Sequence, residues 1–207
     1  MKTALIIISI IVVILALTTF YFYNESTKAR TERDLQVTNV TQEKETEIST
    51  LKETYDELVV SMQKEIEQGQ IKITQLADRL SVSMVDKILF PSGEAKITPD
   101  GLEILERVGN VLKDTPSKII RVEGHTDNVP IHPRLQKHFP TNWELSTARA
   151  TNVVRFLQEK TGIDPKRLQA IGMSEYRPTA SNSTEQGRTQ NRRIEIILLP
   201  EPISIVK

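Results

Sequence analysis

The sequence predicts an α+β domain, with two helices packed on a mixed β-sheet, preceded by a transmembrane helix and a helical stalk. Three observations lead to this fold class. An uncharged apolar run lies at the N-terminus, all ten prolines lie at or after Pro91, and Gly69 is the only glycine before Gly93. A long helix can form in the N-terminal segment, because the helix breakers proline and glycine are absent there. After that segment we expect shorter elements separated by turns. We therefore divide the chain into residues 1–23, 24–69 and 70–207.

Residues 4–23 read ALIIISIIVVILALTTFYFY and carry no charge. Twenty helical residues span about 30 Å, the thickness of the hydrocarbon core of a bilayer. A cleaved signal peptide is the competing interpretation, but its apolar region would be shorter and would end in small residues. Tyr21, Phe22 and Tyr23 occupy that place. We expect an uncleaved anchor that crosses the membrane once.

The predicted stalk carries a short heptad pattern. Its apolar residues are spaced by 3, 4, 3 and 4 positions: Ile48, Leu51, Tyr55, Leu58 and Met62. About two heptads fall short of the three or four that establish a coiled coil. A single solvated helix and a parallel dimeric stalk both remain open, and we expect a homodimer through the stalk.

Beyond Gly69 the pattern alternates as in strands at residues 70–74 and again at residues 80–85, ahead of the apolar run 88–90. Thr98 can cap a helix that has Pro99 at its first position. The apolar residues of this helix are Leu102, Leu105, Val108 and Leu112, and Pro116 ends the region. Residues 119–123 form a short strand that leads into Gly-His-Thr-Asp.

A second helix begins at Thr141, which forms a capping box with Glu144, and Gly162 is placed to stop it. Its apolar residues are Leu145, Val153, Val154 and Leu157. Residues 167–171 are a further strand, 181–187 a polar loop, and 193–199 a last strand with Ile194, Ile196 and Leu198 on one face.

Composition excludes several functions. The 207 residues hold 27 basic and 27 acidic side chains and no cysteine, which excludes disulfide scaffolds, thiolate metal sites and catalytic cysteines. No segment is basic enough to predict nucleic acid as a partner. His125, His132 and His138 with Asp127 match no familiar ligand spacing. We expect no metal and no cofactor.

Four polar residues lie at predicted strand ends and at a helix start. Asp127 follows one strand, Asn142 and Arg149 share a stripe of the second helix, and Arg192 opens the last strand. A carboxylate and a guanidinium held apart suit a zwitterionic amino-acid head group: the acid takes the ammonium and the arginine takes the carboxylate bidentately. A plain Asp127–Arg149 salt bridge is the competing interpretation, which spacing alone favours.

Four motifs in order carry a family resemblance over about residues 86–199. They are FPSG at 90–93, GHTDNVPI at 124–131, NWELS with ARA at 142–150, and GR with NRRIE at 187–195. They resemble the OmpA-like peptidoglycan-binding domain family, in its MotB-like branch. The resemblance implies non-covalent binding of peptidoglycan in which Asp127 and Arg149 grip the diaminopimelate of the stem peptide. Asn142 and Arg192 would line the same pocket.

The resemblance also implies a place in the cell and leaves two alternatives. We expect a protein of the bacterial inner membrane with its C-terminal domain in the periplasm. A stator component of an ion-driven motor is one alternative, but the polar residues of the span are Ser9, Thr18 and Thr19, none of which is ionisable. An enzyme acting on the wall is the other, but the motifs offer no paired carboxylates and no metal-bound water. We expect a non-catalytic binding protein.

Overall fold

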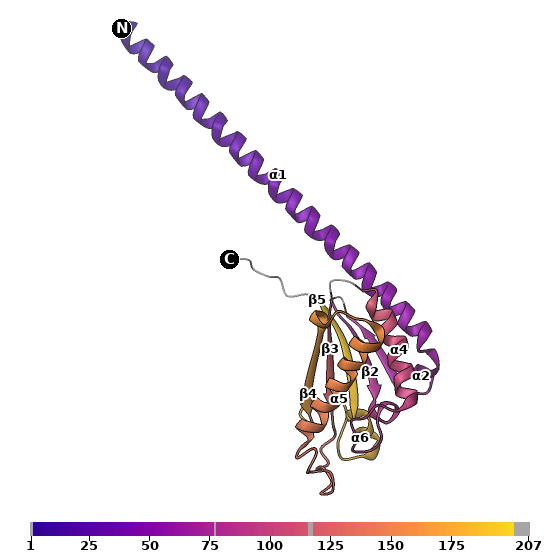
Figure 1. Ribbon diagram of the computed structural model, residues 1–207. Helices are drawn as coiled ribbons and strands as arrows, with labels where there is room; N and C mark the ends of the chain where they lie inside the picture. Colours follow the sequence, from indigo (N-terminus) through magenta and orange to yellow (C-terminus); the bar gives the residue numbers. More distant parts are fainter. Residues whose placement is uncertain (1, 77, 116–117, 201–207) are drawn as a thin grey trace. The chain divides into compact units, whose positions relative to one another are not determined.

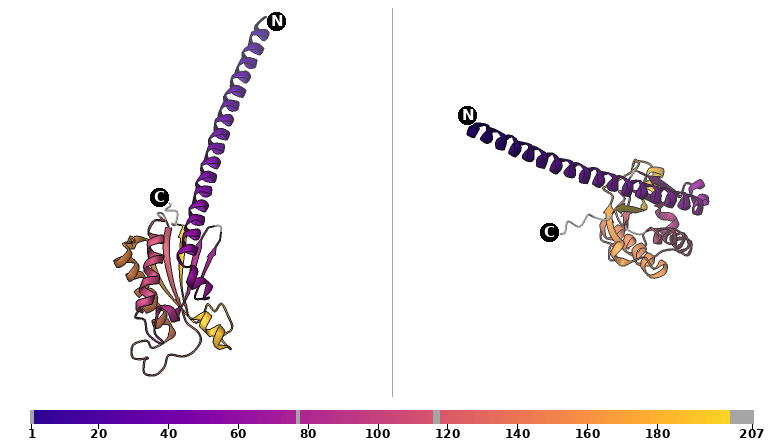
Figure 2. Two further views of the ribbon diagram at one scale, coloured as in Figure 1. Left: turned by 90° about the vertical axis from the view of Figure 1, so that its right-hand side faces the viewer. Right: turned by 90° about the horizontal axis from the view of Figure 1, so that it is seen from above.

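The computed structural model describes residues 2–76, 78–115 and 118–200. The chain divides into two compact units, Met1–Glu47 and Ile48–Lys207. One unbroken helix, α1 (Lys2–Ser61), runs from the first unit into the second (Figure 1, Figure 2).

The first unit consists of the N-terminal part of α1. Its apolar side chains from Ile10 to Tyr23 are at least half exposed, and their charged neighbours begin at Glu25. Among the described residues α1 is the one helix long and apolar enough to cross a membrane, by length and composition. The predicted N-terminal helix is therefore present.

The second unit is built on one five-stranded sheet with the order β1-β2-β5-β3-β4. Its strands are β1 (Ile71–Gln75), β2 (Leu80–Val85), β3 (Lys118–His125), β4 (Leu168–Ser174) and β5 (Arg193–Pro200). Only β3 and β4 pair in parallel, whereas the other neighbours are antiparallel. The predicted mixed sheet is confirmed.

Two longer helices, α4 (Pro99–Lys113) and α5 (Asn142–Phe156), lie on one face of this sheet (Figure 1). The predicted caps are present: Thr98 accepts a hydrogen bond from the Gly101 amide, and Thr141 and Glu144 form the capping box. After a π-helical turn (Leu157–Thr161), Gly162 ends the helix with φ 73°. A positive φ is inexpensive only for glycine.

The core lies between the sheet and these helices. Ile194, Ile196 and Leu198 of β5 are fully buried, as predicted. Gly124 of β3 lies so close to α5 that an added Cβ would be 2.2 Å from the carbonyl oxygen of Ser146. Leu102 differs from the prediction, because it is 38% exposed while Ile104 takes a buried position on α4.

The predicted heptad residues have a different role from the one expected. Leu51, Leu58 and Met62 are buried in the core of the second unit, and Tyr55 packs against it. Arg107 of α4 fixes this segment, because it donates to the Ser61 carbonyl oxygen at 2.6 Å and to Glu65 at 2.6 Å. The compact unit thus begins at Ile48 rather than at residue 70.

Among the described residues, four further short elements belong to the unit, namely α2 (Gln63–Glu67), α3 (Asp86–Leu89), a 3-10 turn (Pro165–Arg167) and α6 (Glu185–Asn191). One of them corrects the prediction, because the predicted polar loop 181–187 runs into helix α6. Ile88 and Leu89 of the apolar run 88–90 lie in α3. Thr184 caps α6 by accepting from the Gly187 amide at 3.1 Å. Pro116 falls outside the described residues.

Candidate functional site

The four predicted residues meet in one polar cluster at the ends of β3, α5 and α6. Asp127 follows β3, Asn142 is the first residue of α5, Arg149 lies two turns further along α5, and Arg192 joins α6 to β5. Asp127, Asn142 and Arg149 are all buried, with at most 7% of their surface exposed. Arg192 is partly open to solvent. Residues from distant parts of the sequence thus come together as predicted.

Arg149 is held by a partner that the sequence did not reveal. Its Nη1 donates to Oδ2 of Asp86 at 2.8 Å, and its Nε donates to the Glu94 carbonyl oxygen at 2.8 Å. The guanidinium also lies 5.0 Å from the centre of the Phe90 ring, within the range of a cation–π contact. No described residue accepts a hydrogen bond from Nη2 of Arg149, so this nitrogen can serve a ligand.

Asp127 does not form the salt bridge with Arg149 that we considered. Its Oδ1 accepts from the Val129 amide at 3.0 Å, and its Oδ2 accepts from Nη1 of Arg192 at 2.5 Å. The Asp127 carboxylate is therefore paired with Arg192, and the Arg149 guanidinium is paired with Asp86. Because each has its own counter-ion, Asp127 and Arg149 do not neutralise each other.

Arg192 connects the two pairs. Its Nε lies 3.8 Å from Oδ1 of Asp86, and its Nη2 donates to Glu185 at 3.0 Å and to Thr189 at 2.9 Å. Burial tends to lower the pKa of Arg192, but its hydrogen bonds with Asp127 and Glu185 raise it above the usual value. Arg192 therefore remains charged. Glu185 and Thr189 belong to α6, the helix that the sequence did not predict.

Asn142 fixes the loop that follows β3. Its Nδ2 lies within hydrogen-bonding distance of Oε2 of Glu175 at 2.7 Å, of the Val129 carbonyl oxygen at 3.1 Å and of the Asp127 carbonyl oxygen at 3.3 Å. No described residue donates to the side-chain oxygen of Asn142. That oxygen therefore keeps its capacity to accept a hydrogen bond, and the Nδ2 of the same amide lies 3.3 Å from the Asp127 carbonyl oxygen.

Burial dominates the electrostatics of the inner pair. It raises the pKa of the Asp86 carboxyl above its usual value, and the positive charges of Arg149 and Arg192 offset this shift only in part. Burial likewise lowers the pKa of Arg149, against the attraction of Asp86. Because Asp86 and Arg149 are already desolvated, a charged group that binds beside them meets weakly screened charges.

A sequence model of the OmpA family matches residues 89–192, about half of the chain. The chain belongs to the OmpA family. The match contains Asp127, Asn142, Arg149 and Arg192, and it begins three positions after Asp86. The family resemblance of the four motifs is thereby confirmed.

Several relatives share this OmpA-family segment. Motility protein B of Bacillus subtilis is 37% identical over 133 residues, which are 64% of this chain and 50% of that protein. Peptidoglycan-binding protein ArfA of Mycobacterium tuberculosis is 33% identical over 111 residues, which are 54% of this chain and 32% of that protein. The chain therefore spans about half or less of the length of these relatives.

Solved structures confirm the fold. A MotB-like protein from Desulfovibrio vulgaris has a TM-score of 0.68 and 26% identity, over 76% of this chain and 98% of that chain. The cell wall anchor of the T6SS from Pseudomonas aeruginosa has a TM-score of 0.62 and 33% identity, over 70% of this chain and 97% of that chain. The α+β domain is thus an OmpA-like, MotB-like domain.

Proposed function

We propose that the second unit binds peptidoglycan non-covalently, by gripping the diaminopimelate of a stem peptide with Asp127, Arg149, Asn142 and Arg192. The observation that carries the proposal is the buried cluster, in which an acid and an arginine are each held by a counter-ion of their own. Diaminopimelate within a stem peptide keeps one free amino-acid end, with an ammonium and a carboxylate on the same carbon. Such a head group offers one charge to each side of the cluster.

The remaining hydrogen-bonding capacity supports a definite orientation of this head group. The ammonium would be accepted by Asp127 and by the side-chain oxygen of Asn142. The carboxylate would be bound by Nη2 of Arg149, because Asp86 and the Glu94 carbonyl oxygen already occupy Nη1 and Nε. This differs from the bidentate arginine grip expected from the sequence. Arg192, as the partly exposed cation, would supply the second charge near the carboxylate.

The names of the relatives support wall binding as the function of the domain. ArfA is named a peptidoglycan-binding protein, and the structural neighbour from Pseudomonas aeruginosa is described as a cell wall anchor. We extend this role to the present chain, as binding without catalysis. The cluster supports it, since each of its aspartates is engaged by an arginine, Asp86 by Arg149 and Asp127 by Arg192.

We further propose that α1 anchors the protein in the bacterial inner membrane, with the second unit in the periplasm. The twenty uncharged residues 4–23 support this arrangement. A homodimer through the stalk would use residues upstream of Ile48, where Leu35, Val37 and Val40 are more than half exposed. Two domains on one membrane would then gain avidity on a repeating polymer.

The stator alternative draws support from the similarity to Motility protein B. Against it, residues 4–23 contain no carboxylate that could relay an ion. Wall anchoring requires no such residue, so we prefer it as the function of this chain.

Binding of two synthetic stem peptides tests the proposal directly. One carries diaminopimelate, and the other carries lysine in its place and so presents an ammonium without the neighbouring carboxylate. Calorimetry with the detergent-solubilised full chain should detect the first peptide and at least about tenfold weaker binding of the second, since losing one partner of a buried pair costs about 2–5 kcal/mol. Equal affinity for both peptides, or no binding of either, would refute the assignment.

A further inference from the structure

A second group of buried polar residues lies between β3 and β5, apart from the proposed head-group site. Glu123 and His125 belong to β3 and Glu195 to β5, where Glu123 is paired with Glu195 across the ladder. One ligand atom from each of the three side chains lies within 4.8 Å of the others. Gly124 faces α5, so its neighbours Glu123 and His125 point to the opposite face of the sheet, since side chains alternate along a strand.

His125 is the unusual member of this group. It is only 3% exposed, and neither of its ring nitrogens has a hydrogen-bond partner among the described residues. Its Nε2 lies 3.5 Å from Oε2 of Glu123, without hydrogen-bond geometry. A buried polar group without a partner is costly, and native proteins rarely keep one without a reason. A ligand between the imidazole and the carboxylates would remove this cost.

Two arginines lie beside the carboxylates of this group. Nε of Arg193 donates to Oε1 of Glu195 at 2.6 Å, and Nη1 of Arg121 lies 3.8 Å from Oε1 of Glu123. Oε1 of each carboxylate is therefore turned to an arginine, while Oε2 of Glu123 is turned to His125. The two guanidinium charges oppose a cation, so the affinity should be below that of a site made only of acids and histidine.

We propose that Glu123, His125 and Glu195 bind one divalent transition-metal ion of the Zn²⁺ class. Imidazole nitrogen and carboxylate oxygen are both zinc ligands, with bonds of about 2.0–2.2 Å. Two ligand atoms on one tetrahedral ion are then about 3.3–3.5 Å apart, and Nε2 of His125 lies 3.5 Å from Oε2 of Glu123. A ligand atom of Glu195 lies within 4.8 Å of these two, and its side chain would move closer to complete a site with three protein ligands and one water.

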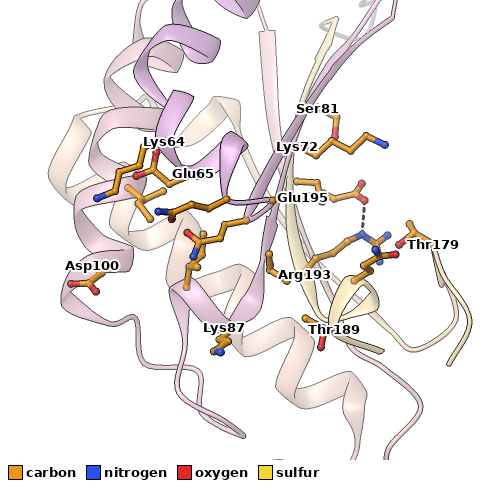
Figure 3. Close-up of a pocket in the computed structure, with 18 of the residues that line it drawn as sticks. Lys64, Glu65, Lys72, Ser81, Lys87, Asp100, Thr179, Thr189, Arg193 and Glu195 are labelled. Carbon is orange, nitrogen blue, oxygen red and sulfur yellow. Dashed lines mark hydrogen bonds and ion pairs between the residues drawn. The ribbon is translucent and has the colours of Figure 1, made fainter. Parts of the chain in front are cut away.

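Glu195 lines a polar groove, and an ion would enter the site from this side. Figure 3 shows Arg193 and Glu195 in a polar groove with Lys72, Ser81 and Thr179, and Glu195 keeps 20% of its side chain exposed.

The sequence predicted no metal site, because the only histidines that could be combined with His125 belong to a loop and their spacing matches no ligand pattern. His132 and His138 are exposed in that loop, whereas Glu195 lies 70 positions from His125 and meets it only through the β3–β5 ladder.

Zinc titration of the metal-free, untagged full chain in detergent tests the site. We expect one Zn²⁺ per chain, with at least about tenfold weaker binding in Glu195→Gln, since even outer-shell partners of a metal contribute 10–100-fold. His132→Gln with His138→Gln is the matched control, and it should bind zinc like the parent. Zinc binding that survives in Glu195→Gln or disappears in the double control would refute the proposal.

Cobalt spectroscopy keeps the test independent of how the variants fold. The wild-type chain should develop saturable visible absorption at one Co²⁺ per chain, with the intensity of a four- or five-coordinate ion, and Zn²⁺ should abolish it. A wild-type chain that shows only the weak spectrum of hydrated Co²⁺, or no saturation, contains no such site.

Discussion

Replacing Leu58 by alanine should destabilise the second unit strongly. Leu58 is fully buried and belongs to the same core cluster as the strands, although it lies on α1. A buried Leu→Ala change costs about 2–5 kcal/mol, from lost burial and from the cavity that remains. Ile48 is the matched control, because it shares the predicted heptad seam but is 47% exposed. Ile48→Ala should change the free energy of unfolding by only about 0.5 kcal/mol.

Urea unfolding of the full chain in detergent measures this difference, with the fluorescence of Trp143 as the signal. Trp143 is the only tryptophan, and it lies on α5, so it reports on the second unit alone. For a urea dependence of about 2 kcal/mol per molar, Leu58→Ala should lower the midpoint by about 1–2.5 M. A coiled-coil seam would instead make both variants lose self-association while the midpoint stayed unchanged. That result would refute the placement of Leu58 in the domain core.

Three further changes test the fold and the cluster. Asp86 has a raised pKa through burial, so the folded state binds its proton more tightly than the unfolded state, and stability should fall as pH rises from the unfolded-state pKa through the folded one. Urea midpoints in Asp86→Asn should lack this component. Thr141→Ala removes the acceptor of the Trp143 amide and should cost about 1 kcal/mol of unfolding free energy, whereas an unchanged midpoint would contradict the cap. Gly124→Ala places a Cβ 2.2 Å from the Ser146 carbonyl oxygen and should lower the thermal unfolding temperature, whereas an unchanged temperature would contradict the close contact of β3 with α5.

Local signals in the sequence predicted most of the domain. Thr98, Thr141 and Gly162 marked helix ends correctly, because caps depend on neighbouring residues alone. The strands could be predicted from the alternation of apolar and polar residues, since one face of the sheet is buried. Helix α6 was missed because the segment Glu185–Asn191 contains no apolar residue, so periodicity could not reveal it; Thr184 with Glu185 in the first turn was its one signal.

Partners distant in the sequence could not be predicted. Asp86 is 63 positions from Arg149, and Glu175 is 33 positions from Asn142, so each contact depends on the finished fold. The role of the heptad residues could not be predicted for a different reason. Over two heptads, a 3.5-residue coiled-coil repeat and the 3.6-residue stripe of a helix on a domain core place apolar residues at the same positions. Leu51, Leu58 and Met62 fit both patterns, and only the packing distinguishes them.

Co-sedimentation of the detergent-solubilised full chain with purified sacculi tests the central proposal most directly. The variants are Asp127→Ala and Arg149→Lys, each first shown to be folded by its urea midpoint. Arg149→Lys keeps the charge but cannot hold Asp86, the Glu94 carbonyl oxygen and a ligand carboxylate at once. Both variants should lose retention by at least about tenfold, whereas Asn142→Ala should lose less, since a neutral hydrogen bond contributes about 1 kcal/mol. Folded Asp127→Ala and Arg149→Lys chains that sediment with sacculi like the parent would contradict the assigned pocket.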